Sequence, residues 1–232
     1  MSYYYNNNGN GGFKSQIPPV TKNLVIINVI MFIATLINQD FMIETFALFY
    51  PTSPFFHPWQ IITHMFMHGG FWHIFFNMYT LVMFGTVLER AIGSKKFLVF
   101  YFITGLGAVL LHQGVEFMRI HMMDTSNMQL YYSAVADILR TPTVGASGAI
   151  YGVLIGYGLL YPESVLMLMF PPIPLKAKWM VMIFIAIELF TGVAGTADGV
   201  AHFAHLGGML FGWLLLVIWR KSGSLYRQDK WF

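Results

Sequence analysis

Apolar residues are gathered into long blocks along this chain, and polar residues fill the connectors between the blocks. A helix needs about 20 mainly apolar residues to cross the hydrocarbon core of a bilayer, and each block is close to that length. The six blocks cover residues 23–38, 71–88, 95–115, 147–161, 178–195 and 200–219. The pattern predicts an all-α membrane protein with six transmembrane helices, the shortest of them at 147–161.

The composition agrees with a membrane protein and argues against several other classes. Hydrophobic residues make up 56% of the 232 residues and charged residues only 10%, whereas a soluble domain carries about 25% charged residues. The chain has no cysteine, which excludes a thiol nucleophile, a thiolate metal site and disulfide bonds. Its net charge of +3 is too small and too scattered to indicate a nucleic-acid partner.

The blocks divide the chain into three segments. Residues 1–20 start with a stretch rich in Tyr, Asn and Gly; we expect a disordered cytoplasmic tail, because the basic start and cleavage site of a signal peptide are missing. Residues 21–220 form the predicted six-helix membrane domain, and residues 221–232 form a short cytoplasmic C-terminal tail. A compact core with a short polar tail is typical of a protein of the bacterial plasma membrane.

The Lys and Arg residues give an independent test of the six-helix count. If the N-terminus is cytoplasmic, eleven of the thirteen fall in cytoplasmic segments, and only Arg119 and Arg140 fall on the other side. Short cytoplasmic loops carry such an excess of positive charge, and one miscounted span would move the later charges across the membrane. Both termini are therefore predicted to be cytoplasmic.

Two outer connectors are long enough to have structure of their own. Residues 39–70, between the first and second helices, are rich in aromatic residues and proline, which predicts a loop partly embedded at the level of the lipid headgroups. Residues 116–143 mix Met, Tyr and charged residues. They predict a short interfacial helix before the turn at residues 140–142.

Polar side chains inside three of the predicted helices fall at one depth. Such groups are costly in lipid and mark a functional site by default. His73 and Asn77 are four residues apart and share one helix face, while Ser147 and His205 lie in the fourth and sixth helices. With about 1.5 Å of rise per residue, all four lie roughly 20–25 Å from the cytoplasmic ends of their helices. We expect them to meet in the outer third of the membrane.

Small residues allow the fourth and sixth helices to approach each other closely. They recur at spacings of three and four, at Gly148, Gly152 and Gly156 in the fourth helix and at Ala201, Ala204, Gly208 and Gly212 in the sixth. A serine on one of these surfaces and a histidine on the other can come within hydrogen-bond distance. Close packing of the two helices is therefore predicted.

A serine and a neutral histidine in contact are the parts of a hydrolytic site. The imidazole takes the hydroxyl proton while the serine oxygen attacks a carbonyl carbon, and backbone N–H groups, Asn and His can stabilise the oxyanion. By the same count of helical rise, Glu188 lies ten residues above Lys178, near the midplane. We expect this carboxyl group to bond to a neighbouring helix or to have a gating or proton-sensitive role. The sequence therefore predicts a Ser147–His205 dyad without a carboxylate.

Three motifs bring these residues together. They are the string Gly-Ala-Ser-Gly-Ala-Ile-Tyr-Gly at 145–152, the pattern His64-x3-His68-x4-His73-x3-Asn77, and the stretch Ala204-His205-x2-Gly208-x3-Gly212. In type and order, over about residues 55–215, they resemble the motifs of the rhomboid intramembrane serine proteases, the first being their GxSG motif. The resemblance implies a six-helix rhomboid bundle that hydrolyses peptide bonds in or near transmembrane segments of membrane-protein substrates, without a metal or a cofactor.

The resemblance also implies a role for each motif residue. Ser147 would be the nucleophile and His205 the general base. The oxyanion hole would consist of His73, Asn77 and the backbone amide of Ser147. The supporting residues would be Tyr151, packed on the His205 ring, Gly145, which leaves room for the substrate backbone, and Gly148, His68 and His64. The fifth helix and the loop above it, at 178–200, would gate the access of the substrate.

Three features depart from the family pattern. Many relatives have Trp-Arg in the first outer loop, where this chain has Trp59-Gln60, so an arginine anchor is missing. The 116–143 segment is long. His202 is an additional histidine three residues before His205. We assign the base to His205 because small residues follow it at +3 and +7, and we expect His202 to make a polar contact between helices.

Three other interpretations remain open. A catalytically inactive rhomboid-like protein that binds membrane clients should have lost Ser147 or His205, and both are present. A membrane transporter should carry polar groups through the whole thickness of the bilayer, whereas here they stop in the outer third. An iron-dependent membrane oxygenase uses histidine ligands, but it needs more well-placed histidines than this chain has and leaves Ser147 unexplained.

Overall fold

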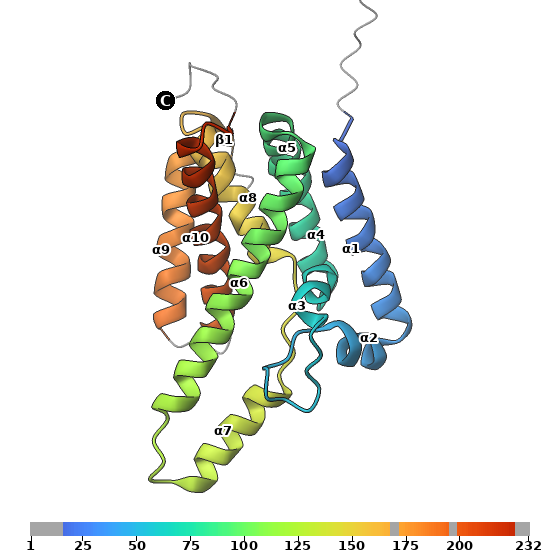
Figure 1. Cartoon of the computed structure of the whole chain (residues 1–232), viewed down its shortest axis with the longest axis vertical. Coiled ribbons are helices and arrows are strands. Elements are labelled where there is room, and N and C mark those ends of the chain that lie inside the picture. The colour runs from blue at the N-terminus through green and yellow to red at the C-terminus, as the bar shows by residue number, and fades with distance from the viewer. Residues whose placement is uncertain (1–15, 168–171, 195–198, 226–232) are drawn as a thin grey trace, which may run out of the picture.

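The computed structural model describes residues 16–167, 172–194 and 199–225. Most of the two predicted tails, at 1–20 and 221–232, lies outside these residues. Within them the chain is almost wholly helical, as Figure 1 shows. The elements, in chain order, are α1 (Pro19–Ile37), α2 (Gln39–Phe46), α3 (Gln60–Thr63), the 3-10 helix η1 (His64–Phe66), α4 (Phe71–Thr80), the π-helix η2 (Leu81–Gly85), α5 (Thr86–Ile92), α6 (Ser94–Met122), α7 (Met128–Arg140), α8 (Ser147–Leu160), β1 (Val165–Met167), β2 (Pro174–Lys176), α9 (Ala177–Val193) and α10 (Gly199–Lys221).

The prediction of a helical membrane protein is confirmed, and four helical segments among the described residues are long and apolar enough to cross a bilayer. They are Pro19–Ile37, Phe71–Ile92, Ser94–Met122 and Ala201–Lys221. The second of them runs through α4, η2 and α5. α8 has 14 residues and α9 has 17, which is short for the full thickness of the hydrocarbon core. Six spans with both termini cytoplasmic therefore stay a prediction.

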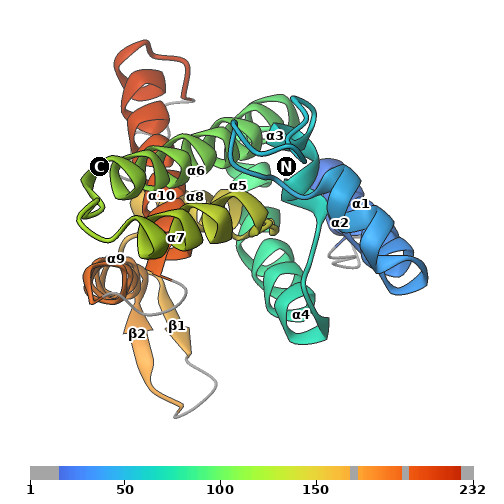
Figure 2. The same cartoon turned by 90° about the horizontal axis from the view of Figure 1, so that it is seen from below.

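α8 is the central helix of the bundle. It is buried on nearly all sides, with α6 and α10 packed against it, while α1 and α9 lie at opposite sides of the molecule (Figure 1, Figure 2). A side chain at Gly208 of α10 would collide with the carbonyl oxygen of Gly148. A Cβ at Gly212 would lie 3.2 Å from the carbonyl oxygen of Gly152. The predicted close approach of these two helices is confirmed.

The outer segment between α1 and α4 folds into short helices around one buried glutamine. Gln60 donates hydrogen bonds from Nε2 to the carbonyl oxygens of Glu44 (3.0 Å) and Phe55 (2.9 Å). Its Oε1 accepts a bond from the backbone N–H of His57 (3.1 Å). The neighbouring Trp59 donates from Nε1 to a carbonyl oxygen of α2. Gln60 thus ties the loop together at the position where an arginine anchor was noted as missing.

At the opposite end of the bundle, one buried carboxylate joins three helices. Glu89 of α5 has only 2% of its surface exposed. It accepts hydrogen bonds from the backbone N–H groups of Val20 (3.0 Å) and Thr21 (2.7 Å) in the first turn of α1. It also accepts from the hydroxyl groups of Thr21 (2.8 Å) and Ser94 (2.7 Å), the latter at the start of α6. These bonds fix where α1 and α6 begin.

The two remaining connectors are also ordered. The short helix predicted within 116–143 is confirmed as α7, which starts where the side chain of Asn127 accepts a hydrogen bond from the N–H of Leu130. Its place at the membrane interface stays a prediction. α6 runs on to Met122, seven residues beyond the predicted end, because the polar residues after 111 do not break a helix. β1 and β2 pair as an antiparallel hairpin just before α9, with Val165 opposite Lys176.

Candidate active site

Ser147 is the first residue of α8, and the segment before it is held on three sides. Thr143 and Leu48 exchange two backbone hydrogen bonds of 2.8 and 2.9 Å, and the Thr143 hydroxyl lies 2.9 Å from Nε2 of His112. The N–H of Gly145 donates to the carbonyl oxygen of His64 (3.0 Å). These contacts fix the position of Ser147 at the start of α8.

His205 of α10 faces this serine. Its Nε2 lies 2.9 Å from Oγ of Ser147, which is the distance of a good hydrogen bond. Tyr151, one turn into α8, stacks on the imidazole with ring centroids 4.1 Å apart and an angle of 7° between the planes. The structure therefore brings Ser147, His205 and Tyr151 together across the α8–α10 contact.

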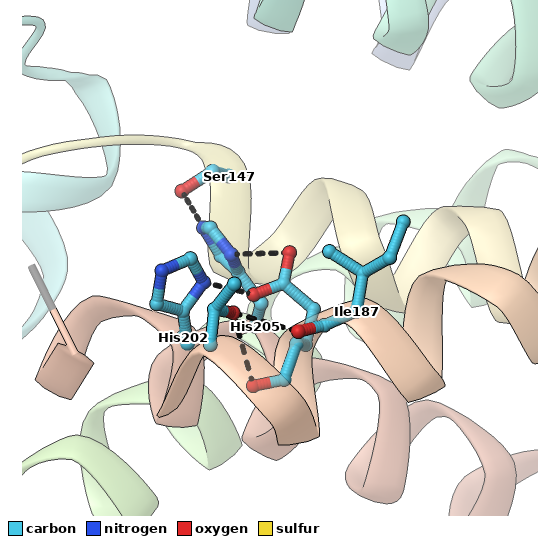
Figure 3. A network of polar contacts seen from close by, with 6 residues as sticks. Ser147, Ile187, His202 and His205 are labelled. Atoms are coloured by element: carbon cyan, nitrogen blue, oxygen red, sulfur yellow. Dashed lines mark hydrogen bonds and ion pairs between the residues drawn. The ribbon is translucent and has the colours of Figure 1, made fainter. Parts of the chain in front are cut away.

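A third helix completes the network, and this corrects the sequence analysis. Glu188 of α9 is 4% exposed, with Oε1 3.1 Å from Nδ1 of His205 and Oε2 2.5 Å from Nδ1 of His202, in the network of polar contacts of Figure 3. The prediction that the site lacks a carboxylate is wrong. Counting backbone rise placed Glu188 below Ser147, but the imidazole of His205 spans that interval, with one nitrogen toward each residue.

The predicted contact of His202 with a neighbouring helix is confirmed by its approach to Glu188. His202 also lies edge-on to the His205 ring, with centroids 6.2 Å apart. It is Nε2 of His205, and not a nitrogen of His202, that the structure pairs with the Ser147 hydroxyl. The two histidines are three residues apart on one face of α10, so one carboxylate reaches both of them.

Gly145 keeps a space open between the side chains of His73 and Ser147. A Cβ at Gly145, where φ is +137°, would lie 3.0 Å from Nε2 of His73 and 3.4 Å from Oγ of Ser147, so glycine keeps this space open. Nδ1 of His73 accepts the N–H of Gly69 at 3.4 Å, which places the proton of the neutral ring on Nε2. The Nδ2 group of Asn77 is buried and has no hydrogen-bond partner among the described residues. The N–H of Ser147, in the first turn of α8, has no intrahelical acceptor.

Two further histidines of the second motif lie behind this space. The ring of His68 is buried and stands edge-on to His73, with centroids 4.9 Å apart and an angle of 68°. Nδ1 of His64 lies 2.8 Å from the carbonyl oxygen of Gln60. His68 therefore packs against a side chain of the site, whereas His64 belongs to the framework that holds the segment before α8.

A small cavity opens beside the serine and adjoins a larger one. The small cavity holds about 50 Å³ and is lined by Ser147 and His205. The larger and more open cavity, between α6 and α7, holds about 450 Å³ and carries charged side chains, among them Glu116 and Asp137. Thr143 lines both cavities. The larger cavity has room for several water molecules, and the small cavity has room for water beside the hydroxyl of Ser147.

The same side chains are also the set in the described part of the chain that could hold a metal ion. One ligand atom from each of Glu188, His202 and His205 lies within 4.8 Å of the others, and two imidazoles with one carboxylate suit zinc. From the sequence we expect neither a metal nor a cofactor.

The helix that carries Glu188 lies at the edge of the bundle. α9 packs mainly against α10 and α8 (Figure 1, Figure 2). The segment predicted to gate the substrate, 178–200, includes residues 195–198, which lie outside the described residues. The gate therefore stays a prediction.

Comparison with known proteins places these features in a family context. A family model described as the rhomboid domain matches residues 56–222. The chain is 32% identical to Rhomboid protease AarA of Providencia stuartii over 162 residues, which are 68% of this chain and 55% of that protein. It is 31% identical to RHOMBOID-like protein 12, mitochondrial, of Arabidopsis thaliana over 192 residues, covering 82% of this chain and 55% of that protein.

A yeast protein gives a third match. The chain is 28% identical to Rhomboid protein 1, mitochondrial, of Saccharomyces cerevisiae over 187 residues, which are 75% of this chain and 47% of the relative. The chain thus spans about half the length of the curated relatives it matches. The matched region includes all the residues that meet around Ser147.

Proposed function

The chain belongs to the rhomboid family, and on this basis we propose that it is an intramembrane serine endopeptidase. It hydrolyses peptide bonds in or near the transmembrane segments of other membrane proteins, which it meets within the lipid bilayer. The observation that carries the proposal is the distance of 2.9 Å between Oγ of Ser147 and Nε2 of His205. A serine hydroxyl is a weak nucleophile until a base in contact with it accepts its proton.

In the first half of the reaction, Oγ of Ser147 attacks the carbonyl carbon of the scissile bond. Nε2 of His205 takes the hydroxyl proton as the new C–O bond forms. The same proton then passes from His205 to the leaving amine when the C–N bond breaks, which leaves an acyl group on the serine. The stacked ring of Tyr151 keeps the imidazole in the plane that this transfer needs.

The oxyanion formed in this step needs donors aimed at it before the reaction begins. Nε2–H of His73, Nδ2 of Asn77 and the backbone N–H of Ser147 are proposed for this role. Their support is that His73 and Ser147 border the space kept open at Gly145, and that the amide of Asn77 is buried without a partner among the described residues. An amide group in that condition gains a hydrogen bond when the oxyanion appears.

In the second half, water hydrolyses the acyl group. A water molecule in the cavity beside Ser147 loses a proton to Nε2 of His205 and attacks the acyl carbon, and the serine oxygen then takes the proton back as it leaves. The larger cavity between α6 and α7 is the proposed supply of water. In this scheme His205 carries out every proton transfer, and two side chains and one backbone N–H group stabilise the oxyanion.

The membrane in which this happens is proposed to be a bacterial plasma membrane. The match to a rhomboid protease of the bacterium Providencia stuartii supports this location, while two other relatives have mitochondrial in their names. Fractionation of the tagged chain from its own host tests the proposal, and recovery with mitochondria would contradict it.

Replacement of the proposed nucleophile tests the function directly. Purified wild type is expected to cleave a generic transmembrane substrate in detergent, and Ser147→Ala is expected to lower the rate by at least about a thousandfold. Ser133→Ala is a matched control, because Ser133 is an exposed serine on α7 whose hydroxyl bonds only to a carbonyl oxygen of its own helix. A fluorophosphonate probe should label wild type and Ser133→Ala but not Ser147→Ala.

Each other outcome points to a different function. Cleavage by Ser147→Ala at the rate of the wild type, or labelling that persists in this variant, contradicts the proposed nucleophile. Wild type that crosslinks to the substrate without cleaving it would indicate an inactive, client-binding protein instead. Substrate flux into vesicles that contain the purified protein would indicate a transporter.

A further inference from the structure

We propose that Glu188 of α9 is a positioning residue for this reaction, which orients His205 and holds it in the tautomer that can accept the proton of Ser147. The inference rests on the proposed function and adds a fourth helix, α9, to a site that the motifs place on α4, α8 and α10. It gives a role to a buried acidic side chain that the chemistry of Ser147 and His205 does not by itself require.

The first step is the burial of the carboxylate. Glu188 is 4% exposed in an otherwise apolar helix, and an isolated carboxylate in such a place would be strongly unfavourable. Both of its oxygens have partners, since Oε1 lies 3.1 Å from Nδ1 of His205 and Oε2 lies 2.5 Å from Nδ1 of His202. The charge is thus held by two imidazoles of one helix.

The second step concerns the proton of His205. A neutral imidazole carries one proton, on Nδ1 or on Nε2. To accept the proton of Ser147, Nε2 must present its lone pair, so the ring proton must be on Nδ1. The negative carboxylate oxygen 3.1 Å from Nδ1 attracts a proton on that nitrogen and so favours this tautomer over the other. It also lies next to the positive charge that the ring acquires when the serine attacks.

The third step is what holds the carboxylate itself. His202 binds the oxygen that His205 does not use, and the hydroxyl group of Tyr151 also interacts with Glu188. Tyr151 therefore contacts the base through its ring and the carboxylate through its hydroxyl. The contacts in Figure 3 form a chain from the serine through His205 to the glutamate, with His202 at the far side.

Glu188 lines neither of the two cavities around the serine. It is therefore expected to act on the base and not on the bound substrate. This separates its effect on turnover from an effect on binding, and it makes the proposal testable by kinetics.

The main experiment replaces the carboxylate by an amide of the same shape. In Glu188→Gln the rate of fluorophosphonate labelling at Ser147 and the kcat for a transmembrane substrate should both fall by at least about tenfold, because the base loses its charged partner. KM should change by less than about twofold. Glu89→Gln is the matched control, since Glu89 is equally buried but contacts no imidazole. Its labelling rate should equal that of the wild type when expressed per folded molecule.

A second measurement uses the wild type and does not depend on whether the variant folds. In protein labelled with ¹⁵N-histidine, the His205 signal, identified by its loss in His205→Ala, should show the proton on Nδ1 at neutral pH. A proton on Nε2 would overturn the proposal. Wild-type labelling by Glu188→Gln would also overturn it, as would a loss that lies in KM or that follows only the unfolded fraction.

A metal ion at the same three side chains is the competing explanation. A chelator is expected to leave labelling and cleavage by the wild type unchanged. Loss of both on chelation, with recovery on addition of zinc, would overturn the proposal and make Glu188 a metal ligand. If the wild type cleaves no substrate at all, the proposed function fails; the labelling rates and the ¹⁵N spectrum still decide whether Glu188 orients His205.

Discussion

Two buried glutamates, Glu89 and Glu188, sit in this membrane protein in opposite settings. Glu89 is 2% exposed and Glu188 is 4% exposed, and each joins its own helix to at least one other. Glu89 accepts hydrogen bonds from two backbone N–H groups and two hydroxyl groups. Glu188 contacts two imidazoles, one of which lies against Ser147. The two carboxylates are alike in burial and differ in their partners.

The difference teaches that burial alone does not reveal what an acidic residue in a membrane does. The donors around Glu89 do not gain or lose protons, and they lie in the first turns of α1 and α6, where unpaired N–H groups need an acceptor. That carboxylate can only fix structure. The partners of Glu188 can exchange protons, and this is why we propose a role for it in the reaction.

Removal of the imidazole between Glu188 and Ser147 should have the largest effect. His205→Ala is expected to lower kcat by at least about a thousandfold. The variant removes the proposed base of Ser147 and, with it, the imidazole through which Glu188 is proposed to act. His202→Ala keeps the contact of 3.1 Å between Glu188 and His205 and should lower kcat only partly. Cleavage of a transmembrane substrate by the two purified variants measures the difference.

A higher activity in His205→Ala than in His202→Ala would contradict the assignment of the base. If His202→Ala were inactive and His205→Ala retained activity, the wrong histidine would have been assigned as the base. Thermal unfolding of both variants in detergent serves as the control, because a loss of activity that follows a loss of fold has no bearing on the choice of base.

The residues around Ser147 were largely predictable because the information is local. Ser147 begins α8. His73 and Asn77 are four residues apart in α4, so they lie on one face of that helix. Each of these relations is a spacing along the chain, and glycine at 148 and 208 predicts which helix surfaces touch. Spacing of this kind survives folding unchanged, since a helix keeps its period.

The contact of Glu188 was not predictable in the same way. It depends on the rotation of α9 and on the level at which that helix passes α10, and neither is a property of spacing within one helix. A signal was present all the same, namely an acidic residue in an apolar helix together with the additional His202 beside His205. The role of Gln60 was missed for a related reason, because its partners are carbonyl oxygens whose positions depend on the path of the loop.

The anchor at Glu89 should show an effect of intermediate size, and on stability alone. Glu89→Gln replaces a carboxylate that accepts four hydrogen bonds with an amide that accepts fewer and carries two donors without acceptors nearby. The free energy of unfolding is expected to fall by about 1–3 kcal/mol. Thermal unfolding in detergent measures this change. Labelling of Ser147 per folded molecule should stay at the rate of the wild type, and a slower rate would remove the distinction between the two glutamates.

A third glutamate has the strongest charged partners and should show the smallest effect, since it is exposed. Glu163 lies 2.7 Å from Nζ of Lys176 and 2.5 Å from Nζ of Lys178, and their hydrogen bonds lower the pKa of its carboxyl group from 4.5 to about 2. Because the folded state has the lower pKa, any stabilisation is complete above pH 4.5 and disappears as the pH falls toward 2.

Glu163→Gln should therefore lower the melting temperature by less than about 3 °C at neutral pH. The difference from wild type should shrink as the pH falls below 4.5, and it should also shrink in about 1 M salt, which screens exposed charges. A difference as large as that of Glu89→Gln would mean that charged partners matter more than burial. The charge of the partners, and not burial, would then decide how much each glutamate stabilises the fold. Glu188, with two imidazoles beside it, would be expected to contribute to stability as well as to turnover.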